Sequence, residues 1–269
     1  MIRFKTKEEI DIMRESGRLT AMVFAHLKQY VEPGITTREL DKIAEDFIRK
    51  NGAIPSFKGY RGFRHTLCTS VNNQVVHGIP SKYKLKKGDI ISIDVGVFKN
   101  GFHGDATRTF VVGGKTSKEA LRLVRTVYKS MLLGIEQAKP GKKLGDIGHA
   151  IQSFAESMGY SVVREYIGHG VGRQLHEDPE VLHYGRPNTG ITLEPGMVIT
   201  IEPILNQGAR FCRTLRDGWT VVTADKKLSA QFENTIAILE DGNEVLTRLE
   251  DNSDIPDCVK DITLDTDIK

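Results

Sequence analysis

The sequence predicts a single α+β domain built from a duplicated unit, with an antiparallel sheet core and two helix pairs on the outside. Two apolar strands that end in an acid support this prediction: LKKGDIISIDVG (85–96) and LEPGMVITIEPI (193–204) place Asp94 and Glu202 108 residues apart. A second pair of matched acids, Asp105 in GDATRTF and Glu233 in FENTIAI, lies 128 residues apart. Such recurrence along one chain indicates a pseudo-twofold duplication.

Four helices are expected, in two pairs. Three of them open with a capping box, a Thr followed three residues later by Glu, at 6–9 (TKEE), 36–39 (TTRE) and 116–119 (TSKE). Apolar residues at helical spacing carry them to about 29, to Asn51-Gly52 and through 135, and a fourth helix ends near 159. Gly52 and Gly159 are 107 residues apart, so the helices follow the same repeat as the acids.

Strand-rich sequence follows each helix pair. The expected strands are 66–77, 89–97, 102–112, 162–166, 197–205, 210–214, 219–224 and 231–239. About twenty extra residues between the acids of the second half predict a hairpin that turns at 216–218. The repeats therefore cover about 6–112 and 116–239 of one domain at 1–250, and we expect the acidic tail at 251–269 to be loosely ordered.

Composition narrows the class of protein. The chain has 269 residues, 39% hydrophobic and 27% charged, as is typical of a globular protein. Its net charge of +3 is too small to predict a specific nucleic-acid partner. Three widely spaced cysteines form no disulfide framework, and neither a signal-like nor a membrane-spanning apolar run occurs. We expect a cytoplasmic protein without a membrane partner.

The matched acids predict a metal centre. Four carboxylates brought together by the duplication cannot all stay ionised without a cation, and a pair of divalent ions would satisfy them. His169, in the glycine-rich stretch YIGHGVG, would complete the ligand set. Each residue alone has an ordinary structural explanation, as a turn acceptor, a surface charge or a packed histidine. The recurrence of two acids at matched strand positions favours the metal site.

These motifs resemble those of type I methionine aminopeptidases of the short bacterial form, in peptidase family M24, over about residues 2–249. The resemblance rests on NNQVVHGIP (72–80), DVGVFKNGFHGDATRTF (94–110), GHGVGRQLHEDP (168–179), ITIEPI (199–204) and QFENTI (231–236). It implies a pseudo-twofold "pita-bread" fold. It also implies two divalent ions, of Co, Mn, Fe or Zn, held by Asp94, Asp105, His169, Glu202 and Glu233.

The resemblance also implies a reaction, the hydrolytic removal of an N-terminal methionine when the second residue is small. Glu202 would be the general base, His176 would face the carbonyl oxygen and His77 the leaving nitrogen. Taken without the resemblance, each histidine is better explained as a structural residue. The implied methionine pocket comprises Tyr60, Phe63, Cys68, His77, His176 and Trp219.

Three residues around the pocket depart from the family pattern. Phe57 and Phe63 stand where other bacterial members have Cys and Tyr, and Leu175 stands where an aromatic residue is common. These departures leave the implied chemistry intact but put the shape of the pocket in question. His26, His65, His103, His149 and His183 match no family role, and we expect them to be structural.

The resemblance further implies an optional site for one monovalent cation, Na or K, near Asn72, Gln74 and Ser229. The expected partners are nascent polypeptides met at the ribosome, and the expected state is a monomer. Two alternatives stay open: a related proline-specific peptidase, and a non-catalytic binding module on the same fold. Neither the N-terminal zinc-finger extension of eukaryotic type I members nor the helical insert of type II members is expected.

Overall fold

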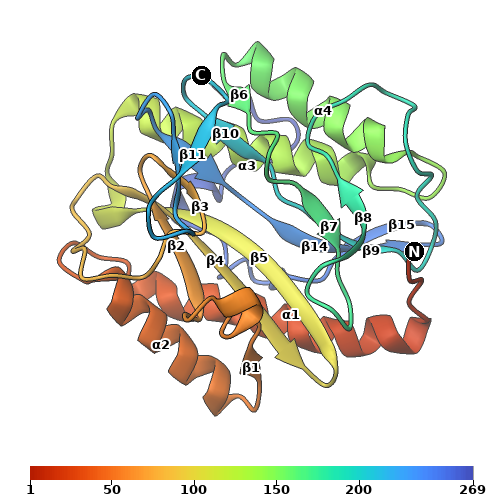
Figure 1. Ribbon diagram of the computed structural model, residues 1–269. Helices are drawn as coiled ribbons and strands as arrows, with labels where there is room; N and C mark the ends of the chain where they lie inside the picture. The colour runs from red at the N-terminus through yellow and green to blue at the C-terminus, as the bar shows by residue number, and fades with distance from the viewer. Residues whose placement is uncertain (269) are drawn as a thin grey trace.

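The helices form two pairs, as the repeat predicts (Figure 1). The computed structural model describes residues 1–268. The helices of these residues are α1 (Lys7–Leu27), α2 (Thr37–Lys50), α3 (Lys118–Gln137) and α4 (Leu144–Ser157), with short 3-10 turns η1 (Lys28–Tyr30), η2 (Tyr60–Gly62), η3 (Val112–Gly114) and η4 (Asp257–Val259). None of these helices is long and apolar enough to cross a membrane.

Capping explains where the helices begin. The hydroxyl groups of Thr6 and Thr36 each accept a hydrogen bond from the backbone N–H of the Glu three residues on, at 3.2 Å, which confirms the first two capping boxes. The third prediction is one residue out. Ser117 caps α3 by accepting from Ala120 N at 3.1 Å, because Thr116 Oγ1 instead donates to Gly88 O at 2.6 Å.

Two antiparallel sheets form the centre of the molecule. In the first, β4 pairs with β1, β2 and β5, and the second has the order β15-β14-β9-β7-β8. Two smaller sheets have the orders β13-β10-β6 and β11-β12-β3. The strands are β1 (Ile54–Pro55), β2 (Leu67–Val71), β3 (Gln74–Val76), β4 (Ile90–Lys99), β5 (Phe102–Val111), β6 (Ser161–Val162), β7 (Gly168–Gly170), β8 (Glu177–Val181), β9 (Val198–Ile201), β10 (Ile204–Asn206), β11 (Cys212–Thr214), β12 (Val221–Thr223), β13 (Ser229–Gln231), β14 (Asn234–Leu239) and β15 (Gly242–Val245).

The α+β class with antiparallel sheets is confirmed, but several strand predictions are corrected. The expected strands 197–205 and 231–239 are each interrupted, at Glu202-Pro203 and at Phe232-Glu233. Only the first residue of 162–166 is in a strand, and β7, β8 and β15 were not expected. The predicted hairpin is present as β11 and β12, with a turn in which Gly218 N donates to Leu215 O at 3.1 Å.

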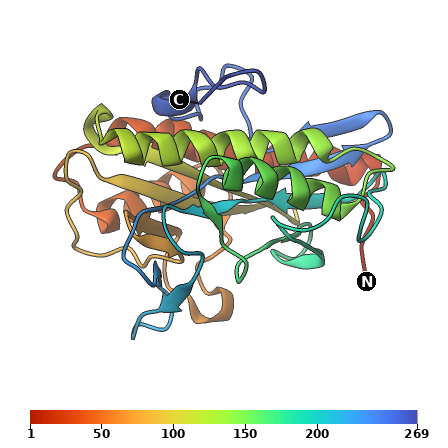
Figure 2. The same ribbon diagram turned by 90° about the horizontal axis from the view of Figure 1, so that it is seen from above.

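Each half has its own hydrophobic cluster. One contains α1 and α2 residues with Ile91, Ile93 and Val95 of β4, and the other contains α3 and α4 residues with Ile199 and Ile201 of β9. In Figure 2, α1, α3 and α4 lie along one face of the sheets. The apolar face of each helix therefore covers its own half-sheet and leaves the opposite face free for a site.

The C-terminal segment differs from the expectation of a loosely ordered tail. Asp254, Ile255, Val259 and Ile262 are buried, and the three apolar residues belong to the cluster of the second half. The acidic composition suggested a solvated end, but these residues recur at intervals of three or four and pack against α3.

Candidate metal centre

The β4–β5 hairpin places the first two acids on one face. Asp94 lies directly opposite Thr107, and Asp105, two residues before Thr107, lies opposite Gly96. Because side chains two residues apart on a strand share a face, Asp94 and Asp105 project from the same side of the hairpin. Asp105 is buried, while Asp94 is partly exposed to the cavity that it lines.

The acids of the second half lie at strand interruptions. Glu202 follows β9, and its carboxylate accepts from Thr200 Oγ1 at 2.8 Å and from Gln231 Nε2 at 3.3 Å. Glu233 precedes β14, and its Oε2 accepts from Thr107 Oγ1 at 2.8 Å. At a regular strand position, a side chain can point only to one face of the sheet. An interruption of the strand removes this restriction, so a long acidic side chain can turn toward the other half of the molecule.

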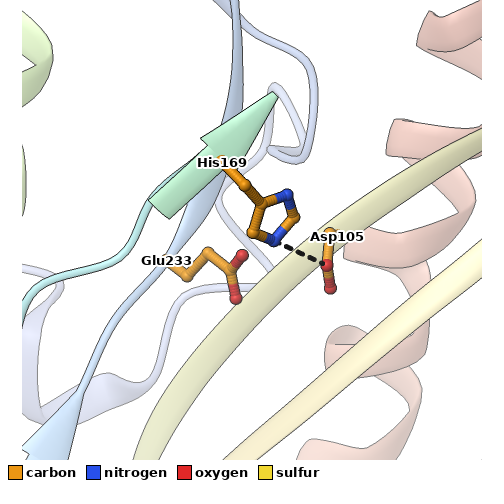
Figure 3. A group of neighbouring side chains, drawn as sticks. All are labelled: Asp105, His169 and Glu233. Carbon is orange, nitrogen blue, oxygen red and sulfur yellow. Dashed lines mark ion pairs between the residues drawn. The ribbon is translucent and has the colours of Figure 1, made fainter. Parts of the chain in front are cut away.

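His169 lies within β7, whereas the sequence placed it between a strand and a turn. Its Nδ1 is 2.9 Å from Gly170 O, so Nδ1–H donates there and leaves the Nε2 lone pair toward the acids. Nε2 is 3.9 Å from Asp105 Oδ2 and 3.7 Å from Glu202 Oε1. Figure 3 shows His169, Asp105 and Glu233 pointing toward one another, and one ligand atom of each lies within 4.8 Å of the others.

Burial controls the protonation of this cluster. It raises the pKa of Asp94, Asp105 and Glu202 well above the usual range, and the neighbouring Glu233 charge adds to each shift. Burial also raises the pKa of Glu233 to about 7. The same burial lowers the pKa of His169 to about 4, so this histidine is neutral and able to ligate at pH 7.

The donor set fits divalent ions. Asp94 Oδ1 and Asp105 Oδ1 are buried without a hydrogen-bond partner, which is costly for a carboxylate oxygen unless a cation takes that place. Oxygen and imidazole donors without a thiolate suit Mn, Fe, Co or Zn. No other cluster of three potential ligands occurs in the part of the chain that the structure describes, residues 1–268.

A cavity of about 370 Å³ opens onto these acids, and all five predicted ligands line it. Its other wall is apolar: Phe57, Phe63, Cys68 and Leu175 are buried together, with Tyr60, Ile79 and Trp219 packed against them. Phe63 meets Trp219 edge to face, with ring centroids 5.0 Å apart. The predicted pocket residues Tyr60, Phe63, Cys68 and Trp219 therefore share one cavity with the acids.

Two further predicted residues, His77 and His176, lie in the same cavity. The His176 ring lies 4.1 Å from that of His169 and stacks on Tyr60 at 5.1 Å. His77 has a backbone φ of 56°, which is uncommon for a residue with a side chain. Desolvation in the cavity lowers the pKa of His77, and desolvation together with the neighbouring His169 lowers that of His176, whose side chain is still open to solvent, so both are neutral at pH 7.

The three residues predicted near a monovalent cation lie outside this cavity. Asn72 lies in the β2–β3 turn and Gln74 is the first residue of β3, and Asn72 O accepts from Ser229 N at 2.9 Å. Ser229 Oγ and Asn206 Oδ1, on paired positions of β13 and β10, are buried without a partner. The β2–β3 turn therefore lies beside the β10–β13 strand pair. Ser229 Oγ and Asn206 Oδ1 have no hydrogen-bond partner there.

Sequence reasoning missed several residues that support the acids. Thr107, Thr200 and Gln231 hydrogen-bond to the carboxylates of Glu233 and Glu202, and His183 Nε2 accepts from Glu202 N at 3.0 Å. The repeat did match Thr107 with Thr235, and that recurrence was an available signal. Thr200 lies two residues before Glu202 on the same strand face, which strand periodicity would have indicated.

Comparisons with known proteins agree on one family. A sequence model of metallopeptidase family M24 matches residues 11–240. Methionine aminopeptidase 1 of Bacillus subtilis is 55% identical over 249 residues, 93% of this chain and 100% of that protein. The crystal structure of methionine aminopeptidase from Rickettsia prowazekii has a TM-score of 0.90 at 46% identity, covering 92% of this chain and 100% of that one. The Xaa-Pro dipeptidase from Bacillus anthracis has a TM-score of 0.74 at 26% identity, covering 91% of this chain but 62% of that one.

Proposed function

The chain belongs to metallopeptidase family M24, and from that membership we propose that it is a methionyl aminopeptidase, which hydrolyses the bond after an N-terminal methionine. The observation that carries the proposal is the single cavity in which a buried acid cluster faces an apolar wall. Such a cavity can hold divalent ions on one side and an apolar side chain on the other.

Asp94, Asp105, His169, Glu202 and Glu233 would hold two divalent ions in this cavity. The unpartnered oxygens of Asp94 and Asp105 support this assignment. When bound, such ions acidify a water molecule and polarise the carbonyl group to be attacked. The donor types are compatible with Co, Mn, Fe or Zn.

The chain's own residues supply the proton transfers. Glu202 lies at the cavity wall beside His169, where its carboxylate can accept a proton from a water molecule in the cavity. His176 is neutral at pH 7, so its N–H can donate to the oxyanion without a change of charge. His77, in the same cavity, is also neutral, so it can hydrogen-bond to the leaving nitrogen, and that nitrogen receives the proton that Glu202 accepted.

The apolar wall explains the choice of methionine. Phe63, Cys68 and Trp219 offer aromatic and sulfur surfaces that a thioether contacts favourably. Because about 370 Å³ must accommodate both the methionine and the start of the following residue, we propose that a small second residue is preferred.

A proline-specific peptidase is the main alternative on this fold. The chain covers 62% of the Bacillus anthracis Xaa-Pro dipeptidase but the whole length of the methionine aminopeptidases compared, which favours the latter. A non-catalytic binding module would have no use for a full ligand set. Release of methionine from Met-Ala-Ser, but no cleavage of Xaa-Pro peptides, separates these possibilities.

The wider setting is also proposed. The substrates are nascent polypeptides met in the cytoplasm near the ribosome, and the protein acts as a monomer. A monovalent ion, Na or K, binds near Asn72, Gln74 and Ser229, with Ser229 Oγ as one unpartnered oxygen in support. Retention of activity after exchange of K⁺ for a large organic cation would argue against this ion having a role.

The test is a titration of metal-free protein with Mn²⁺ or Co²⁺ while methionine release is measured. We expect activity to return as metal is added, and His77→Ala to lower kcat by about 10²–10⁴. Glu202→Ala should lose both metal binding and activity, while His149→Ala, an exposed histidine on α4, is the matched control and should behave as wild type. Absence of methionine release with every divalent ion would end the proposal.

A further inference from the structure

The C-terminal segment packs on the face opposite the cavity. Figure 2 shows this dark blue segment lying over α1 and α3. Its η4 turn contacts α3 and β5, and Ile255, Val259 and Ile262 are buried in the cluster of the second half. The segment lies beyond residue 240, where the match to the family model ends.

A buried ion pair joins this segment to β5. Arg108 and Asp254 have side-chain exposures of 2% and 0%, and their Nη2 and Oδ2 atoms are 2.9 Å apart. The other oxygen of Asp254 accepts from Leu249 N at 3.0 Å. A buried guanidinium without a partner is strongly unfavourable, so the position of Arg108 depends on Asp254.

The same guanidinium holds the backbone that carries Glu233. Arg108 Nη1 donates to Glu233 O at 2.6 Å, and Nη2 donates to Asn234 Oδ1 at 2.9 Å and to Thr247 O at 2.8 Å. Phe24 of α1 lies under the guanidinium, with the ring centroid 5.0 Å from Cζ. Arg108 therefore has one fixed position, set by three parts of the chain.

Glu233 needs such support because it lies where the strand is interrupted. β13 ends at Gln231 and β14 begins at Asn234, and Glu233 between them is paired by an isolated bridge to Thr107, in which Thr107 N donates to Glu233 O over a long 3.4 Å. Thr107 O accepts from Glu233 N at 3.0 Å, and Arg108 binds Glu233 O. Both backbone groups of Glu233 are thus held by consecutive residues of β5, and its side chain points to the acid cluster.

We propose that Asp254, through Arg108, is a positioning residue that fixes Glu233 for metal binding, so that the C-terminal segment supports the metal centre from behind. The inference rests on the proposed function for its meaning in catalysis. It predicts that loss of the Asp254 charge weakens metal binding, although Asp254 touches neither metal ligand side chains nor the cavity.

The test compares two Asp→Asn variants in the same segment. Asp254→Asn removes the buried partner of Arg108, and Asp261→Asn removes the exposed partner of Arg125, whose two nitrogens are each 2.7 Å from an Asp261 oxygen. We expect Asp254→Asn to raise the Kd for Mn²⁺, measured by calorimetry on metal-free protein, by about tenfold. It should lower kcat for Met-Ala-Ser with little change in KM, and Asp261→Asn should leave all three values within about twofold.

The proposal is overturned if Asp254→Asn binds Mn²⁺ as wild type does, even with a lowered Tm, or if both variants shift Kd equally. If Asp254→Asn does not fold, Arg108→Lys serves instead, because it keeps the charge but cannot reach Glu233 O and Asp254 together. Wild-type Mn²⁺ affinity in Arg108→Lys would likewise overturn it. If wild-type protein releases no methionine, the proposed function fails, while the calorimetry still decides the inference.

Discussion

Removal of the Glu233 charge should change how the stability of the metal-free protein depends on pH. The pKa of this carboxyl rises from its ordinary 4.5 to about 7, chiefly through burial. A group with a raised pKa binds its proton more tightly in the folded protein than in the unfolded chain. The protonated Glu233 side chain therefore makes its full contribution to the stability of the folded protein below pH 4.5. This contribution is lost as the pH rises through about 7, because the buried side chain then has to ionise.

The magnitude follows from the two pKa values. At about 1.36 kcal/mol per pKa unit, the shift of Glu233 from 4.5 to about 7 corresponds to about 3 kcal/mol. Buried histidines act in the opposite direction, since burial lowers the pKa of His183 to about 3 and that of His169 to about 4. They are present in both wild type and a Glu233→Gln variant, so their contribution cancels in the difference between the two proteins.

The assay is urea unfolding of the metal-free wild type and of Glu233→Gln at several pH values from 5 to 8. The stability of the wild type relative to the variant should fall by about 2–3 kcal/mol over this range, slightly less than the full shift because part of it lies below pH 5. The difference also includes the repulsion that Glu233 exerts on Asp94, Asp105 and Glu202. A difference that stays constant, or grows with pH, would refute the account of the acid cluster.

Three further predictions concern neighbouring parts of the molecule. Lys5 Nζ and the Glu177 carboxylate form a buried ion pair at 2.8 Å, so Lys5→Met leaves the Glu177 charge without its cationic partner. Urea unfolding should show a free energy of unfolding lower by about 3–5 kcal/mol. The double variant Lys5→Met, Glu177→Gln should recover part of this loss, because it removes the unpaired charge. Gly104→Ala would place a Cβ 2.8 Å from Gly17 N and should lower stability by about 1–3 kcal/mol, so an unchanged Tm would contradict the close packing of β5 on α1. Calorimetry in buffers of different ionisation enthalpy should detect more protons released on Mn²⁺ binding at pH 6 than at pH 8, and equal numbers would mean that the acids are already ionised.

The sequence predicted the parts of the fold that rest on local signals. Capping at Thr6 and Thr36 was correct because it involves residues three apart, and β4 was expected because a short apolar run leads directly into Asp94. β7 was missed because a three-residue strand of Gly, His and Gly has neither alternation nor strand propensity. It exists because β8 and β9 pair with it, which local sequence does not encode.

The C-terminal segment shows the same limit more strongly. Asp254 is one of several acids in a polar stretch, and nothing nearby distinguishes it from Asp251, which is exposed. Its burial depends on Arg108, 146 residues earlier in the chain. A charged residue becomes a core residue only when its partner arrives from elsewhere, so composition alone predicted a solvated tail.

The duplication explains more of the site than the matched acids alone. Thr107 and Thr235 each lie two residues after an acid, in equivalent positions of the repeat. Thr107 Oγ1 donates to the Glu233 carboxylate at 2.8 Å, and Thr235 Oγ1 donates to Asp105 O at 2.8 Å. Each half therefore supplies an acid to the cluster and a hydroxyl group that secures the acid-bearing residue of the other half. Neither half could hold its acid in place alone, because the group that does so belongs to the other copy of the repeat.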